Sequence, residues 1–124
     1  MERYSELYNI NVDSVGLPST DISFDISFYA DERERLLRSD FAEILNSMSV
    51  SYNDGTEGYM TMFSDNIIFS NYGIPTLPLG NNNDEIMEIA HSELDVIDVL
   101  DISLIEELAN TVTGFIVSTQ GKMY

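Results

Sequence analysis

The sequence predicts one α+β domain over residues 1–124, in which two to three helices pack on one face of a small antiparallel or mixed sheet of about four to five strands. Two patterns predict this class. Residues 21–29 alternate strictly between polar and apolar side chains, and residues 31–48 carry apolar side chains at helical spacing. The length of 124 residues and the 44% hydrophobic content suit a single compact domain with one core.

The strand predicted over 21–29 should bury one face and leave the other in water. Its apolar face carries Ile22, Phe24, Ile26 and Phe28, and its polar face carries Asp21, Ser23, Asp25 and Ser27. The helix predicted over 31–48 should bury a stripe made of Leu36, Leu37, Phe41, Ile44, Leu45 and Met48. Its arginines, Arg33, Arg35 and Arg38, have acidic neighbours at helical spacing, so we expect ordinary surface ion pairs there.

Three short strands are expected after this helix, at 49–53, 58–64 and 66–70. The dipeptide Asp54-Gly55 is a strong signal for a turn between the first two. Residues 72–83 contain several glycines and prolines and break both periodicities, so we expect an irregular segment there.

The rest of the chain is predicted to be mainly helical. One helix begins at Asp84, capped by Asn82 or Asn83, and runs towards residue 100, with a strand over 94–100 as the competing interpretation. Ser103 and Glu106 form a capping box for a second helix over 104–112. Gly114 would end this helix, and residues 115–117 would form a closing strand. The first twenty residues show no decisive pattern.

The charge of the chain excludes several kinds of partner. There are 22 acidic and 5 basic residues, which give a formal net charge of −17. Nucleic acids and anionic membranes are bound through lysine and arginine, so direct binding to either is excluded. The sequence has no cysteine, no membrane-spanning apolar run and no leader-like start, so we expect a cytoplasmic protein.

A search for catalytic motifs finds none that is complete. Glu88 and His91 have the spacing found in di-iron bundles, but such a site needs a second histidine, and His91 is the only one. Phosphate-binding glycine motifs and a nucleophile elbow are absent from the sequence. The adjacent carboxylates Glu106 and Glu107 lack a tryptophan for sugar stacking. The sequence therefore predicts no enzyme, no catalytic residue, no metal site and no cofactor.

The acidic residues are unevenly placed. From Ser39 to Gly121 there are 14 acidic residues and no basic one. Because uncompensated repulsion costs stability, we expect these acids to form a partner-binding face. That face consists of Asp84, Glu85, Glu88, Glu93, Asp95, Asp98, Asp101, Glu106 and Glu107. A second acidic face would carry Asp21 and Asp25.

These properties predict a non-catalytic inhibitor that binds the basic nucleic-acid-binding groove of another protein. In size and charge the chain resembles the small acidic DNA mimics that phages and mobile elements use against restriction, CRISPR or repair enzymes, and it would then act in the host cytoplasm. Two alternatives stay open: a toxin-immunity protein that covers an exosite of a basic nuclease, and an acidic structural or interaction protein. Phe24 and Phe28 could also pack across a homodimer.

Overall fold

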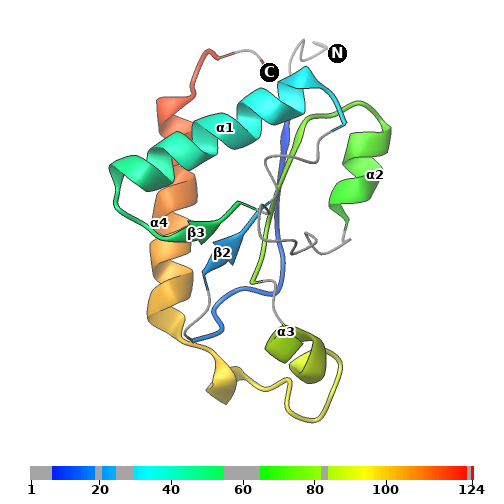
Figure 1. Cartoon of the computed structure of the whole chain (residues 1–124), viewed down its shortest axis with the longest axis vertical. Helices are drawn as coiled ribbons and strands as arrows, with labels where there is room; N and C mark the ends of the chain where they lie inside the picture. Colours follow the sequence, from blue (N-terminus) through cyan, green and yellow to red (C-terminus); the bar gives the residue numbers. More distant parts are fainter. Residues whose placement is uncertain (1–6, 19–20, 25–29, 55–64, 82–83, 123) are drawn as a thin grey trace, which may run out of the picture.

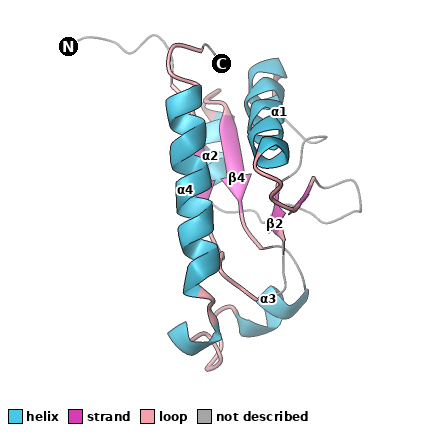
Figure 2. Ribbon diagram, turned by 90° about the vertical axis from the view of Figure 1, so that its left-hand side faces the viewer, coloured by secondary structure: helices cyan, strands magenta, loops and turns pink. Residues whose placement is uncertain are grey.

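The computed structural model describes residues 7–18, 21–24, 30–54, 65–81, 84–122 and 124, and the side chains of 84, 85 and 87 are not described. The elements in chain order are β1 (Asn9–Val12), β2 (Ile22–Ser23), α1 (Glu32–Ser47), β3 (Tyr52–Asn53), α2 (Asn66–Asn71), β4 (Thr76–Leu79), α3 (Asp84–Ile89), the short 3-10 helix η1 (Ile97–Val99) and α4 (Ile102–Ser118). The strands lie between α1 and α4 (Figures 1 and 2), and α2 packs on β1 and β4. None of the described helices is long and apolar enough to cross a membrane.

The strands of the described residues form two small parallel pairs, not the predicted antiparallel or mixed sheet of four to five strands, so that prediction is wrong. β1 pairs with β4 from Asn9 opposite Thr76 to Val12 opposite Leu79, and β2 pairs with β3. A single antiparallel bridge between Ser23 and Gly80 joins the two pairs. Parallel strands require a long crossover, which α1 and α2 supply between β1 and β4.

Strand β4 lies inside the segment predicted to be irregular. All four of its residues, Thr-Leu-Pro-Leu, are buried. A strand that is buried on both faces has no reason to alternate between polar and apolar side chains, so the pattern that reveals a half-buried strand is missing. The prediction of an irregular segment over 72–83 is therefore wrong at its centre.

Helix α1 confirms the predicted helix. Asp31 caps it, because its side chain accepts a hydrogen bond from the backbone N–H of Glu34 at 3.0 Å. Of the predicted apolar stripe, Leu37, Phe41 and Leu45 are completely buried, whereas Leu36 and Met48 are exposed.

The arginines of α1 differ from one another in burial. Arg33 pairs with Asp31 at 2.7 Å and Arg35 pairs with Glu32, both at the surface as predicted. Arg38 is buried, and its guanidinium lies 3.4 Å from the buried carboxylate of Glu34. The prediction of a surface pair at Arg38 is wrong, because this face of the helix packs on β4.

Two of the predicted strands differ from the structure where it describes them, and a third is confirmed in part. Of the described residues 21–24 of the strand predicted over 21–29, β2 contains two, and its Ser23, expected in water, is buried beside Phe24. Residues 25–29 and the strand predicted over 58–64 lie outside the described residues. β3 confirms the end of the strand predicted over 49–53. The segment predicted as a strand over 66–70 is helix α2.

The helical back half also differs from its prediction. α3 ends at Ile89, because His91 adopts a left-handed backbone with φ of 62° that a helix cannot contain. Residues 94–100 form neither the predicted helix nor the competing strand, apart from η1.

Helix α4 is longer than predicted. Its N-cap is Asp101 rather than Ser103, and it continues through Gly114 to Ser118, so the predicted stop and closing strand are wrong. A Cβ at Gly114 would meet nothing within 4 Å, which shows that this glycine sits on an open face of the helix.

Three buried phenylalanines connect the helices to β2. The ring of Phe41 on α1 lies 5.4 Å from that of Phe24 and 5.2 Å from that of Phe115 on α4, both in edge-to-face geometry. Each buried aromatic side chain contributes about 1.5–3 kcal/mol through removal from water. This cluster fixes the distance between α1 and α4, and the candidate site lies next to it.

Candidate functional site

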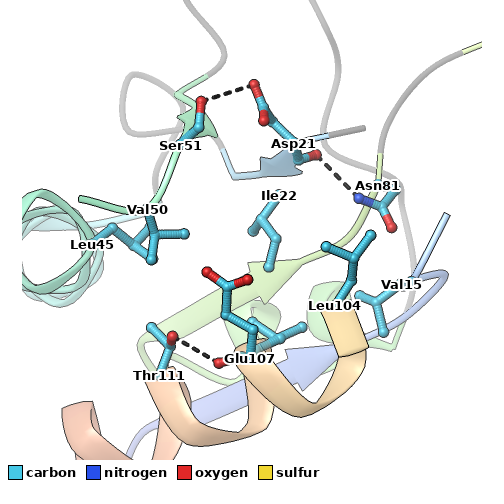
Figure 3. A pocket seen from close by; sticks show the side chains of 12 residues that line it. Val15, Asp21, Ile22, Leu45, Val50, Ser51, Asn81, Leu104, Glu107 and Thr111 are labelled. Atoms are coloured by element: carbon cyan, nitrogen blue, oxygen red, sulfur yellow. Dashed lines mark hydrogen bonds between the residues drawn. The ribbon is translucent and has the colours of Figure 1, made fainter. Parts of the chain in front are cut away.

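A cavity of about 190 Å³ opens where α4, the start of β2 and the end of α1 approach one another. Figure 3 shows the side chains that line it. The lining residues are Val15, Gly16, Asp21, Ile22, Leu45, Val50, Ser51, Asn81, Leu104, Glu107, Leu108 and Thr111. Half of them are aliphatic, and the polar ones come from four separate segments, so the cavity combines apolar walls with a few convergent polar groups, as ligand sites do.

Asn81 ties two walls of the cavity together. Its side-chain N–H donates to the carbonyl of Asp21 at 3.1 Å, and its side-chain oxygen accepts from the backbone N–H of Leu17 at 3.1 Å. Asn81 is 3% exposed and directly follows Gly80, which bridges to β2. The end of β4 therefore sets the position of both the loop before β2 and the loop after β1.

Gly16 places this loop against α4. Its φ is +92°, a conformation that side-chain-bearing residues rarely adopt, and an added Cβ would lie 2.6 Å from the side chain of Ile105. Its carbonyl accepts a hydrogen bond of 2.8 Å from the N–H of Asp101, the N-cap of α4. The close approach needs glycine at this point.

Two carboxylates lie at the cavity. Asp21 accepts a hydrogen bond from the hydroxyl of Ser51 at 3.1 Å. Glu107 projects from α4, and its carboxylate points into the cavity towards the space between Val50 and Ile22 (Figure 3). The hydroxyl of Thr111 donates to the backbone carbonyl of Glu107 at 2.8 Å, so it is used inside the helix.

The basic residues of the described chain are committed to other acids. The ion pairs are Arg33 with Asp31, Arg35 with Glu32, Arg38 with Glu34 and Lys122 with Asp40. The fifth basic residue, Arg3, lies outside the described residues. Within the described ranges, no ion pair therefore involves Asp21 or Glu107, and the cavity carries negative charge.

Comparison with known protein families shows to which family the chain belongs. The sequence model of peptidase family M28 matches residues 2–116, which is most of the 124 residues. The chain belongs to peptidase family M28. No curated protein and no solved structure matches the chain significantly.

Membership in this family overturns the functional prediction made from charge. The family match points to a peptidase-like domain, so the prediction of a non-catalytic DNA mimic of the anti-restriction or anti-CRISPR type is wrong, and so are its two non-enzymatic alternatives. The physical reason is that net charge governs solubility, association rate and non-specific attraction, and does not determine fold or chemistry.

Of the predicted acidic residues whose side chains the structure describes, two lie at the cavity. Asp21 and Glu107 line it, whereas Glu106 does not, and all three are exposed. Four further members of the predicted face are exposed away from the cavity. Glu88 lies on α3, Glu93 and Asp95 lie between α3 and η1, and Asp98 lies on η1. Asp25 and the side chains of Asp84 and Glu85 lie outside the description. A partner-binding role for these residues stays a prediction.

Asp101 has a local structural role. Its carboxylate accepts hydrogen bonds from the hydroxyl of Ser103 at 2.5 Å and from the N–H of Ser103 at 2.9 Å. These bonds to the charged form, the hydroxyl first and the backbone second, lower the pKa of Asp101 below its usual value. Asp101 therefore stabilises the start of α4, beside the loop that carries Gly16.

Metal-ligating side chains do not converge in the described part of the chain. No group of three or more histidine, aspartate and glutamate side chains there could hold a metal ion. His91 is exposed after α3, where its backbone N–H donates to Asp95 at 3.4 Å, and it does not line the cavity.

Reasoning from sequence missed Gly16, Ser51 and Asn81, which shape the cavity. Their weak signal is position: Ser51 precedes β3 and Asn81 follows β4, so both lie where a strand meets a loop. Asn81 lies just beyond the carboxyl end of β4, and the carboxyl ends of parallel strands are common places for ligand-binding residues, but β4 was not predicted as a strand.

Proposed function

We propose that this chain binds peptides in the cavity between α1, β2 and α4 and takes part in their hydrolysis as a peptidase of family M28. The observation that carries the proposal is the family match over residues 2–116. The cavity supports it, because about 190 Å³ is somewhat larger than the roughly 150 Å³ that accommodates benzene. One apolar side chain of a peptide would fit this space.

The polar groups of the cavity suit a peptide backbone. Carboxylate oxygens of Asp21 and Glu107 can accept hydrogen bonds from peptide N–H groups, and the amide of Asn81 holds the wall next to them. A carboxylate within hydrogen-bond reach of a water molecule can also remove its proton as a general base. We therefore assign Asp21 to water activation and Glu107 to peptide binding.

The donor chemistry of the chain does not fit the usual catalytic zinc site. Zinc sites that activate water use donor sets such as three histidines, two histidines with a glutamate, or two cysteines with a histidine. This chain has one histidine and no cysteine, so it cannot supply any of these sets by itself. Its abundant carboxylates are the ligand type that suits magnesium, calcium and manganese. We therefore assign no step to a metal ion.

A cleavage assay tests the proposal. The full chain is incubated with a mixture of synthetic peptides, with and without added Mg²⁺, Mn²⁺ or Zn²⁺, and the products are identified by mass spectrometry. We expect cleavage that falls at least about tenfold in the double variant Asp21→Asn/Glu107→Gln. The matched control, Asp98→Asn/Glu106→Gln, also removes one aspartate and one glutamate charge, but outside the cavity, and should keep the activity.

Two results would overturn the proposal. The first is the absence of cleavage under all metal conditions. The second is equal cleavage by the two double variants, since a co-purified peptidase would not respond to substitutions in this cavity. Far-UV circular dichroism of each variant ensures that a loss of cleavage is not a loss of folding.

A further inference from the structure

We propose that the cavity selects peptides in which an apolar residue is directly followed or preceded by lysine or arginine, with the apolar side chain inside the cavity and the cationic group on Glu107. This inference deepens the proposed function and rests on it for the claim that the ligand is a peptide. It concerns which peptide segment the site prefers, which the family match does not address.

The aliphatic walls of the cavity favour an apolar side chain of the peptide. Leu45 and Val50 form one side, Ile22 lies above, and Leu104 and Val15 close the other side (Figure 3). At about 190 Å³ the space accommodates a leucine or phenylalanine side chain but leaves little room for a second one. Burying such a side chain contributes about 1.5–3 kcal/mol, whereas alanine would leave most of the cavity unfilled.

The negative charge at the cavity favours a lysine or arginine next to the apolar residue of the peptide. Glu107 points into the cavity, and Asp21 lies across from it beside Ser51 (Figure 3). Each basic residue of the described chain already pairs with another acid, so none of those ion pairs reaches Glu107. The whole chain carries a net charge of −17, which attracts cations towards this opening and repels acidic peptides.

The surroundings of Glu107 make the pairing specific. Glu107 is exposed as a residue, but its carboxylate faces the space between Val50 and Ile22, both aliphatic and both partly buried. An ion pair that is flanked by apolar groups is screened less by water and salt than one on an open surface. A guanidinium or ammonium group that sits here therefore gains more than one that meets Glu106, an exposed carboxylate one residue earlier on α4 that does not line the cavity.

The experiment measures binding, so that it does not depend on turnover. Fluorescence anisotropy is recorded with a labelled acetyl-Gly-Leu-Arg-Gly-amide peptide at low temperature. Three matched peptides replace arginine by glutamine, arginine by glutamate, or leucine by alanine. We expect the arginine peptide to bind at least about fivefold more tightly than the glutamine peptide, and the glutamate and alanine peptides to bind more weakly still.

Two variants at neighbouring positions distinguish binding at Glu107 from attraction of the peptide to the net charge of the protein. Glu107→Gln and Glu106→Gln each remove one negative charge from α4, but only Glu107 lines the cavity. We expect Glu107→Gln to abolish the preference for arginine over glutamine and Glu106→Gln to keep it. Equal preference in the two variants would overturn the inference, because it would show attraction to the net charge alone. Equal binding of the leucine and alanine peptides would overturn its apolar half.

The outcome for peptide preference is distinguishable from the outcome for hydrolysis. If the Glu107-dependent preference is present but no peptide is ever cleaved, the inference holds and the proposed hydrolysis fails. If peptides are cleaved with no preference for a basic neighbour, the proposed function holds and this inference fails.

Discussion

The carboxylate of Glu34 and the guanidinium of Arg38 lie 3.4 Å apart inside the protein, and both bind the backbone of Thr76 in β4. Glu34 accepts from the N–H of Thr76 at 3.1 Å, and Arg38 donates to its carbonyl at 3.1 Å. Glu34 also accepts from the N–H of Ala30 at 2.5 Å. One helical turn of α1 thus supplies the hydrogen bonds that a further strand would otherwise supply at this residue.

Replacing one partner of this buried pair should destabilise the fold strongly. Glu34→Ala removes the buried carboxylate that pairs with Arg38 and leaves the N–H groups of Thr76 and Ala30 without this acceptor, so we expect a loss of about 3–5 kcal/mol in the free energy of unfolding. Urea denaturation measures it. Glu32→Ala, which removes an exposed acid from the same helix, should change stability far less. Equal losses in the two variants would contradict the structure.

Two glycines should respond to alanine in opposite directions. Gly16→Ala combines a positive φ with a clash on Ile105, so we expect a loss of about 2–4 kcal/mol. Gly114→Ala lies inside α4 with open space around the new methyl group, so the same substitution should stabilise by about 0.5–1 kcal/mol. Thermal unfolding of both variants is the measurement, and a stabilised Gly16→Ala protein would refute the close approach of the loop to α4.

Removal of the Asn81 side chain should loosen the cavity wall. Asn81→Ala leaves the N–H of Leu17 and the carbonyl of Asp21 without this buried partner, at a cost of about 2–3 kcal/mol. Asn46→Ala, which removes an exposed amide that bonds Tyr52, should stay within about 0.5 kcal/mol of the parent. Hydrogen exchange of the backbone amides of residues 14–17 and 21–24 locates the effect. Faster exchange confined to α1 would show that Asn81 does not hold these loops.

Asp101 should make the stability of the protein change with pH in the acid range. Its pKa is lowered in the folded state, so its stabilisation is fully present well above pH 3.8, the ordinary value, and is lost as the pH falls below it. We expect Asp101→Ala to lower the melting temperature at pH 6, and the difference from the parent to shrink below pH 3.8. Asp98→Ala serves as the control on η1. A difference that does not change with pH would show that Asp101 acts without its charge.

Tyr124 should make stability depend on alkaline pH. Burial, and then the hydrogen bond of 2.7 Å that its hydroxyl donates to Asp40, raise the pKa of Tyr124 above 10.0. A raised pKa in the folded state means that the stabilisation is complete below pH 10.0 and is lost as the pH rises above it. In Tyr124→Phe this component should vanish, and Asp40→Asn should reduce it. Melting temperatures between pH 8 and 11 measure it, and identical profiles for parent and Tyr124→Phe would contradict the buried hydroxyl.

The elements that could be predicted from sequence are those whose signal is local. Helix α1 has a cap at Asp31 and a continuous apolar stripe, so its bounds follow from the chain itself. Strand β4 could not be predicted, because it is buried on both faces and its sequence lacks alternation. The end of α4 was misread because Phe115, Ile116 and Val117 have high strand propensity, although Phe115 packs into the core as a helical residue.

The site was harder to predict than the helices. Asp21 and Glu107 were both identified as acidic face residues, but on two separate faces, and only the tertiary structure brings them to one cavity. No local motif marks the family, whose match extends over residues 2–116. Net charge was the strongest single signal and pointed to the wrong function, since a surface property does not report which groups converge in a cavity.

The pairing of β1 with β4 also sets the order in which the molecule can fold. Asn9 and Thr76 are 67 positions apart in the chain, whereas Ile22 and Tyr52 in the other pair are 30 apart. Helices α1 and α4 need only near neighbours to form, and closing the longer loop between β1 and β4 is slower and entropically costlier. Because Asn81 lies two residues after the end of β4, the cavity acquires its final shape only after this late pairing. Refolding should therefore restore helical content before it restores the ability to bind a peptide.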